Sequence, residues 1–147
     1  MLSSSEMIKE RIASFEKACR EAGLRLTHQR LEIYRELAMA VDHPSAELLL
    51  QRLRKKIPMI SLDTVYRTLA TFESYGLISK VDTVESQARY ETRGIRHHHL
   101  ICRKCKKITD FQWQQIDDAT LPEQIERWGR VDIKNVVAYG VCTKCLK

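Results

Sequence analysis

Two pairs of cysteines, Cys102 with Cys105 and Cys142 with Cys145, are the residues of this sequence best suited to hold a metal ion. Each pair has the Cys-x-x-Cys spacing that turns two thiolates toward one point, and two such pairs can surround Zn²⁺ in a tetrahedron. Four thiolates leave no open coordination position, so the cluster predicts a structural zinc site. Redox-active pairs are the alternative, but two matched pairs in a reducing compartment usually hold metal.

Three histidines in a row precede the first cysteine pair. In an extended strand His97 and His99 point to one face and His98 to the other, so His97 and His99 can share an ion. Asp110, on the next expected strand, could reach the same ion, and Glu91 precedes His97 by six residues. Such ligands suit Fe²⁺, Mn²⁺ or Zn²⁺ and bind more reversibly than four thiolates. The alternative is a solvated histidine cluster.

The composition of the chain indicates which kinds of partner it can bind. A net charge of +6 and a pI of about 9.2 favour an anionic partner, although basic and acidic residues nearly balance in the first 90 residues. No apolar run approaches the length of a membrane span, and the beginning MLSSSEMIKER lacks the apolar segment of a secretory signal. We therefore expect no membrane partner and a cytoplasmic location, where thiols stay reduced. The fifth cysteine, Cys19, is expected to be buried in a helix.

The first 90 residues carry the pattern of several helices followed by two short strands. Apolar residues recur at helical spacing, and each predicted helix begins after a residue that can cap it. These residues are Ser3, Thr27, Ser45 and Ser61, with Glu6 completing a capping box at the first and Gly23 ending that helix. Compact helices followed by a β-hairpin are typical of a winged helix-turn-helix domain.

The last predicted helix of this region, LDTVYRTLATFESY, suits DNA. Leu62, Val65, Leu69 and Phe72 form a buried stripe. The expected outer face carries hydroxyls, an aromatic ring and a guanidinium, which can meet base edges and phosphates in a major groove. Its residues are Thr64, Tyr66, Arg67, Thr68 and Thr71. A plain helical bundle with a polar surface is the alternative.

After Glu91 the pattern changes, and a second, smaller unit is expected. Its predicted strands lie around residues 98–102, 107–111 and 131–141. A helix over about 121–128 is predicted between them, opened by a capping box of Thr120 and Glu123 and closed by Gly129. The domains expected are therefore residues 1–90 and 97–147, with a hinge at 91–96.

Taken together, the motifs are similar to those of ferric uptake regulator (Fur) family repressors. RLTHQR, DHPSAELL, SLDTVYRTL, HHHLICRKC, ITDF and YGVCTKC occur in the family's order, from about residue 10 to 147. The resemblance implies an α+β fold, with an N-terminal winged helix-turn-helix DNA-binding domain and a small C-terminal αβ dimerisation domain. It also implies a homodimer that binds palindromic operators in double-stranded DNA.

The resemblance assigns roles by position. The structural zinc would take the four cysteines already named. The regulatory ion, Fe²⁺ or Mn²⁺ with Zn²⁺ able to replace it, would take His43, Glu91, His97, His99 and Asp110. Tyr66 and Arg67 would contact bases, with Arg25 and Thr64 also at the DNA. Because His43 belongs to the DNA-binding domain, one ion touching all five ligands would lock the two domains together and couple DNA affinity to metal concentration.

The departures from the family pattern bear on the signal sensed. Glu91 resembles the iron sensors, whereas Asp110 resembles the peroxide sensors, in which a ligand histidine such as His43 or His97 is oxidised. A further metal site of many iron regulators would need histidines where this chain has Arg96 and Lys134. We therefore expect that site to be absent.

His98 and Asp117, which would have joined that further metal site, are therefore expected to have no role in binding a metal there. A peroxide sensor is slightly favoured, and the alternatives are an iron-responsive or zinc-responsive repressor. A small metalloenzyme is disfavoured, since the sequence has no HExxH or comparable base motif.

Overall fold

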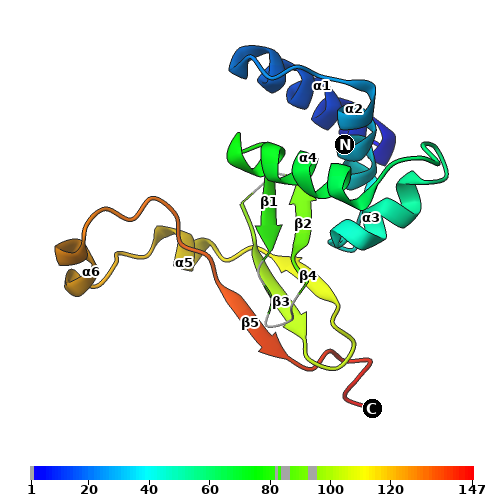
Figure 1. Cartoon of the computed structure of the whole chain (residues 1–147). Helices are drawn as coiled ribbons and strands as arrows, with labels where there is room; N and C mark the ends of the chain where they lie inside the picture. The colour runs from blue at the N-terminus through cyan, green and yellow to red at the C-terminus, as the bar shows by residue number, and fades with distance from the viewer. Residues whose placement is uncertain (1, 82, 84–86, 93–95) are drawn as a thin grey trace. The chain divides into compact units, whose positions relative to one another are not determined.

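The computed structural model describes residues 2–81, 83, 87–92 and 96–147, and the chain divides into two compact units, Met1–Arg93 and Gly94–Lys147. In the described part of the first unit, four helices precede a two-stranded hairpin (Figure 1). The described part of the second unit has a three-stranded sheet and two short helices. None of the helices in these ranges is long and apolar enough to cross a membrane.

The helices of the first unit begin where the capping residues predict. They are α1 (Ser4–Ala22), α2 (His28–Met39), α3 (Ala46–Leu53) and α4 (Leu62–Ser74). Each of the four predicted caps accepts a hydrogen bond from the backbone N–H three residues later. The capping box of Ser3 and Glu6 is formed, and Gly23 ends α1 with the left-handed φ of 71° that glycine tolerates.

An aromatic cluster lies at the centre of this unit. Phe15 of α1 stacks on Tyr34 of α2 at 3.8 Å between ring centroids, and Phe72 of α4 meets Phe15 edge-on at 5.1 Å. Val65, Leu69 and Phe72 of the predicted inward stripe of α4 are buried, and Leu62 is partly buried. Cys19 is buried beside the cluster as expected. The unit therefore has an apolar core of its own, which holds α4 by its inner face.

The hairpin after α4 forms the wing. Strands β1 (Ile78–Val81) and β2 (Arg89–Thr92) pair antiparallel, with Ser79 opposite Glu91. The strand therefore continues through Glu91 and Thr92, two residues into the segment expected to be the hinge. Residues 93–95 of that segment lie outside the described residues.

The second unit is built on strand β3 (His98–Cys102). Strand β4 (Ile108–Phe111) pairs with it antiparallel, and β5 (Val137–Gly140) pairs with its other side in parallel, giving the order β4-β3-β5. Between β4 and β5 the chain carries α5 (Gln114–Asp118) and α6 (Glu123–Trp128), which extend to one side of the sheet (Figure 1). The α+β class predicted from the sequence is confirmed.

Three details of this unit differ from the sequence prediction. The last strand covers only Val137–Gly140 and not residues 131–141. Helix α5 was not predicted. Helix α6 begins after Pro122, which has no side-chain cap, so the capping box of Thr120 and Glu123 does not form. The prediction was wrong there because Pro122, and not Thr120, occupies the capping position.

Candidate metal centres and nucleic-acid interface

The four cysteines of the second unit lie together. Cys102 ends β3 and Cys142 follows β5, and the parallel pairing of these strands brings their carboxyl ends to the same edge of the sheet. All four Sγ atoms lie within 4.8 Å of one another. The Sγ atoms of Cys105 and Cys142 are 3.8 Å apart, which is about the edge of a tetrahedron with Zn–S bonds of about 2.3 Å. The cluster fits Zn²⁺.

The electrostatics of this cluster also favour a cation. The backbone N–H groups of Cys105 and Cys142 point at Sγ of Cys102, at 3.5 and 3.4 Å, and lower the pKa of Cys102 to about 5. The side chain of Cys142 and burial raise the pKa of Cys145 to about 12. The backbone N–H of Cys145 also lowers the pKa of Cys142, so the protein alone favours two thiolates and opposes ionisation of Cys145. A bound divalent cation would allow all four to ionise.

A second group of ligands in this unit lies on the sheet. Asp110 of β4 is paired with His99 of β3, and its Oδ1 lies 3.5 Å from Nε2 of His99 and 3.7 Å from Nε2 of His97. These separations are close to the ~3–3.5 Å expected between ligand atoms bound at about 2.1 Å to one ion. His97 and His99 share a face as predicted, with their ring centroids 4.9 Å apart.

The first unit holds the other two predicted ligands. Nε2 of His43 lies 2.9 Å from Oε2 of Glu91, and both side chains are largely shielded from solvent. His43 lies in the segment between α2 and α3, two residues before the cap Ser45, and Glu91 lies in β2. An imidazole and a carboxylate are thus held in contact by parts of the chain that are far apart in sequence.

Charged side chains that the sequence analysis missed position His43. The guanidinium of Arg89 donates to the carbonyl oxygens of His43 and Asp42. Arg52 of α3 binds both carboxylate oxygens of Asp42, at 3.1 and 2.5 Å, and lowers the pKa of that carboxyl. A sequence gives no sign of these pairs, because the partners are separated by 10 to 47 residues.

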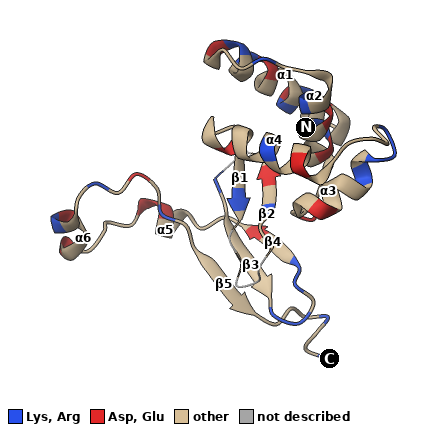
Figure 2. Cartoon of the chain, in the orientation of Figure 1, with Lys and Arg blue, Asp and Glu red and all other residues tan. Residues whose placement is uncertain are grey.

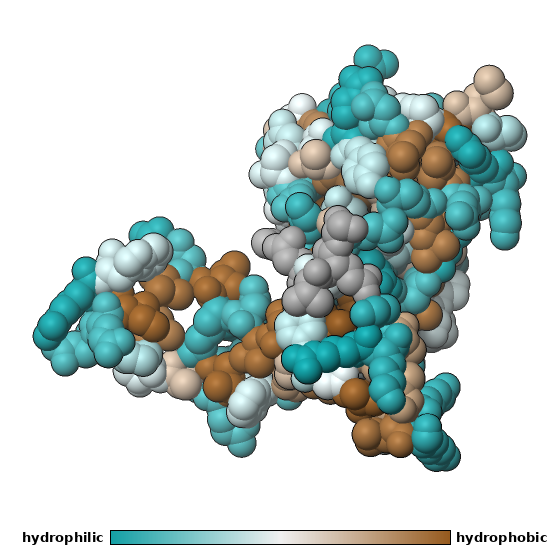
Figure 3. Space-filling model, turned by 60° about the horizontal axis from the view of Figure 1, so that its bottom comes forward, coloured by the Kyte–Doolittle hydropathy of each residue, from teal (hydrophilic) through white to brown (hydrophobic). Residues whose placement is uncertain are grey.

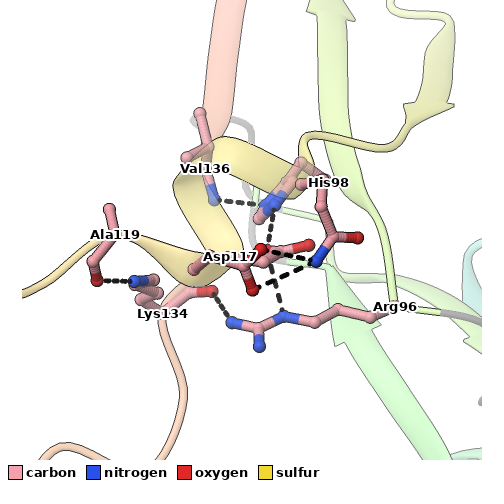
Figure 4. A network of polar contacts seen from close by, with 8 residues as sticks. Arg96, His98, Asp117, Ala119, Lys134 and Val136 are labelled. Carbon is pink, nitrogen blue, oxygen red and sulfur yellow. Dashed lines mark hydrogen bonds and ion pairs between the residues drawn. The ribbon is translucent and has the colours of Figure 1, made fainter.

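His98, which was expected to have no role at a further metal site, makes structural contacts. The ring is fully buried, and Nε2 lies 2.8 Å from Oδ1 of Asp117 on α5 (Figure 4). The backbone N–H of Val136 donates to Nδ1 at 3.0 Å, so Nδ1 is unprotonated and Nε2–H donates to Asp117. His98 does point away from His97 and His99, as predicted, but it joins β3 to α5 and to the chain before β5.

Arg96 and Lys134 extend this contact. Arg96 Nε lies 3.2 Å from Oδ1 of Asp117, and its guanidinium donates to the carbonyl of Lys134 at 3.0 Å. The ammonium of Lys134 donates to the carbonyl of Ala119 at 2.6 Å. Figure 4 shows these groups converging on Asp117 and the backbone around it. The two cations therefore form a polar network here.

The candidate DNA face lies on α4. Tyr66 and Arg67 are exposed, as predicted for its outer side. Thr64 is half-buried, and its hydroxyl lies 2.9 Å from that of Ser61 at the helix cap. Thr68 is buried, so its assignment to the outer face was wrong, because it lies three residues after the inward Val65 and four before the inward Phe72. Arg25 is exposed between α1 and α2.

Comparison with known proteins gives consistent similarities. The model of the ferric uptake regulator family matches residues 21–136. The peroxide-responsive repressor PerR of Staphylococcus epidermidis is 36% identical over 138 residues, covering 94% of this chain and 89% of that protein. A solved zinc-bound manganese uptake regulator is 37% identical, with a TM-score of 0.67, and the match covers 87% of this chain and 98% of that one.

The Helicobacter pylori ferric uptake regulator Fur, described as having three functional metal-binding sites, is 25% identical to this chain. Its TM-score is 0.77, and the match covers 95% of this chain and 94% of that one. The similarity therefore extends through both units and is not confined to the helix-turn-helix.

Proposed function

Because the chain belongs to the ferric uptake regulator family, we propose that it is a metal-dependent DNA-binding repressor that responds to peroxide. The family makes it a transcription regulator, and we infer that it is not an enzyme. A regulator that must reach DNA with reduced thiols is expected in the cytoplasm. The observation that carries the proposal is that the first unit holds an imidazole and a carboxylate suited to bind a metal, those of His43 and Glu91, in contact.

We assign the four cysteines to a structural Zn²⁺ and the imidazole and carboxylate groups to a regulatory ion. The first unit offers two ligands of the regulatory set and the second offers three, His97, His99 and Asp110. Neither group alone fills the coordination of Fe²⁺ or Mn²⁺, whereas five ligands leave one position of an octahedron for a small molecule. The proposed regulatory ion therefore takes ligands from both units.

The chain's own residues would make that ion a switch. Metal binding to a state in which both groups of ligands meet stabilises that state by mass action. In a homodimer, such a state would set the spacing of the two α4 helices for the half-sites of a palindromic operator in double-stranded DNA. Exposed apolar side chains on the second unit support dimerisation through that unit, and they include Leu100, Trp128, Ile133, Val137 and Val141.

A bound Fe²⁺ would supply the one-electron chemistry that activates peroxide, and the similarity assigns the oxidation to the imidazole of His43 or His97. In the net reaction H₂O₂ would give one oxygen atom to a ring carbon, whose C–H becomes C–OH, and the other oxygen would leave as water. Oxidation of either ring would remove a nitrogen ligand and loosen the connection between the two groups of ligands. The similarity to the peroxide-responsive repressor and the carboxylate at Asp110 support this response.

The test is DNA binding by the zinc-loaded protein titrated with Mn²⁺, Fe²⁺ or Zn²⁺, using a duplex selected from a random pool by the Mn²⁺-loaded protein. We expect Mn²⁺ and Fe²⁺ to promote binding, and brief micromolar peroxide to abolish it for the iron form only. Mass spectrometry should then find one added oxygen atom on the peptide of His43 or His97. His43→Ala should lose metal-dependent binding, whereas His28→Ala, in an exposed position on α2, should keep it.

A metal-uptake regulator without the peroxide step is the second candidate. The 37% identity to a manganese uptake regulator and Glu91, a ligand typical of iron sensors, favour it. Iron-dependent DNA binding that survives peroxide would exclude the peroxide sensor and leave this function. Binding promoted by Zn²⁺ at far lower concentrations than by Fe²⁺ or Mn²⁺ would instead indicate a zinc-responsive repressor.

A further inference from the structure

The two exposed side chains proposed to read bases are each held by a carboxylate. The hydroxyl of Tyr66 donates to Oε1 of Glu47, on α3, at 2.5 Å. The guanidinium of Arg67 lies beside Asp63, one turn earlier on α4, with Nε at 2.8 Å and Nη2 at 2.6 Å from Oδ2. Figure 2 shows acidic and basic residues mixed along α3 and α4.

The Asp63 contact uses one side of the Arg67 guanidinium. A guanidinium has five N–H groups, and Asp63 accepts a hydrogen bond from the N–H of Nε, while Nη2 lies 2.6 Å from the same oxygen. The end of the fork, formed by Nη1 and the second N–H of Nη2, remains for another acceptor. Two parallel N–H groups at that end match the O6 and N7 acceptors of guanine in the major groove.

Neither stability nor bulk attraction to DNA explains this pair. The side chains of Arg67 and Asp63 are 79% and 70% exposed, and exposed ion pairs contribute little to folding. A carboxylate on a DNA-facing helix repels phosphates and weakens binding to all sequences alike. A carboxylate that lowers the affinity for all DNA but fixes the plane of an arginine can increase the difference in affinity between a preferred sequence and other sequences.

We propose that Asp63 is a specificity-determining positioning residue, which orients Arg67 to read a guanine, and that Glu47 holds Tyr66 in the same way. This inference rests on the proposed function as a DNA-binding repressor. Both carboxylates act through the neighbouring side chain, and Asp63 carries the sharper prediction because Nε and Nη2 of its partner both lie beside one carboxylate oxygen.

The experiment selects duplexes from a random pool with the full-length, zinc- and Mn²⁺-loaded wild-type protein. It then measures Kd for the best duplex, for each single-base-pair change and for a random duplex. We expect Asp63→Asn to reduce the preference for one G·C pair about tenfold, since a bidentate arginine–guanine contact gives discrimination of that order. Its affinity for the random duplex should stay equal or rise. Glu73→Gln, which removes an exposed charge from the same helix, should leave the preference unchanged.

A double-mutant cycle separates positioning from a direct effect of Asp63. In an Arg67→Lys protein the fork is gone, so adding Asp63→Asn should change the preference no further. An unchanged preference in Asp63→Asn, or an equal loss of affinity for every duplex, would overturn the inference while leaving the proposed function intact. A wild-type protein that selects no sequence would overturn both.

Discussion

At the scale of single residues, the backbone at His43 is held in an unusual conformation by charged neighbours. Its φ of 50° lies in the left-handed region, which is uncommon for a residue other than glycine. The hydrogen bonds from Arg89 and the pair of Arg52 with Asp42 fix the backbone around it. Backbone strain that charged neighbours hold in place is typical of a functional site.

We therefore expect Arg89→Lys to weaken Mn²⁺ binding roughly tenfold, because groups that orient a ligand typically affect affinity by that factor. A lysine ammonium cannot hold two carbonyl oxygens in the plane that the guanidinium provides. Isothermal titration of the zinc-loaded protein with Mn²⁺ measures the effect. Arg54→Lys, a matched change at an exposed position after α3, should leave the affinity unaltered. Equal affinity in both variants would show that the neighbours of His43 do not support the site.

The contact of Tyr66 with Glu47 makes a prediction about pH. The hydrogen bond to Glu47 raises the pKa of Tyr66 to about 12. Because a raised pKa means that the folded protein favours the protonated phenol, this contribution to stability is present below about pH 10 and lost as the pH rises toward 12. Glu47→Gln removes the charge and should return the pKa of Tyr66 toward 10.

The measurement is an ultraviolet titration of phenolate absorbance, with Tyr66→Phe identifying the contribution of this ring. A pKa of Tyr66 that is the same in the wild type and in Glu47→Gln would mean that the contact is absent in solution. That outcome would also contradict the proposal that Glu47 positions Tyr66 for DNA recognition.

At the scale of elements, the docking of α5 depends on polar contacts. Its five residues include none that is buried, so apolar packing alone does not hold the helix. The pair of His98 with Asp117 joins it to β3, and Arg96 adds a second donor to the same carboxylate. The carboxylate of Asp117 therefore takes part in positioning the chain between β4 and β5.

Replacing that carboxylate should loosen the whole segment. We expect Asp117→Asn to destabilise the second unit by about 1.5–3 kcal/mol, the usual contribution of hydrogen bonds to a charged group. Hydrogen exchange at residues 134–140 should become faster. Asp118→Asn, the adjacent exposed carboxylate, is the matched control and should change neither quantity appreciably. Equal protection in the two variants would show that α5 is held by other contacts.

Local signals in the sequence predicted the helices of the first unit, whereas the polar contacts around His98 could not be predicted. Capping residues and apolar periodicity predicted the four helices of the first unit, because these signals are local. The strand predicted over residues 131–141 is shorter, since side chains take the backbone groups before it. Arg96 bonds the carbonyl of Lys134, and His98 accepts from the N–H of Val136. Residue periodicity cannot reveal that competition between side chains and a strand ladder.

For the candidate site too, local spacing predicted some residues and could not predict others. Spacing was sufficient to predict that the four cysteines lie together and that His97 and His99 face one way, because a strand and a tight turn fix those relations. His43 could be named only through the resemblance to a family, and its supporting residues could not be named at all. Whether one ion joins the ligands of both units remains a prediction.

At the scale of the whole molecule, the two units depend on different sources of stability. The first has a core of aromatic and aliphatic side chains from all four helices. In the described part of the second, the buried hydrophobic residues are Ile101, Cys102 and Ile108. Apolar side chains instead reach its surface, as Figure 3 shows along the segment that carries α5 and α6. A small unit with so little buried apolar area needs a metal or a partner chain.

Removing zinc should therefore unfold the second unit and spare the first. Cys142→Ser deletes one thiolate of the cluster that joins the ends of β3 and β5, and zinc binding in such small units supplies folding free energy directly. We expect this variant to keep most of its helical circular dichroism, since α1 to α4 lie in the first unit. It should lose protection from hydrogen exchange at residues 98–111 and 137–140. Sedimentation should show a monomer, because the proposed dimer surface belongs to the unfolded unit.

Cys19→Ser, which changes a buried cysteine of the first unit, is the control and should retain zinc and the dimer. A zinc-free Cys142→Ser protein with an intact sheet would show that the second unit folds without the metal, and a zinc-free dimer would move the dimer surface elsewhere.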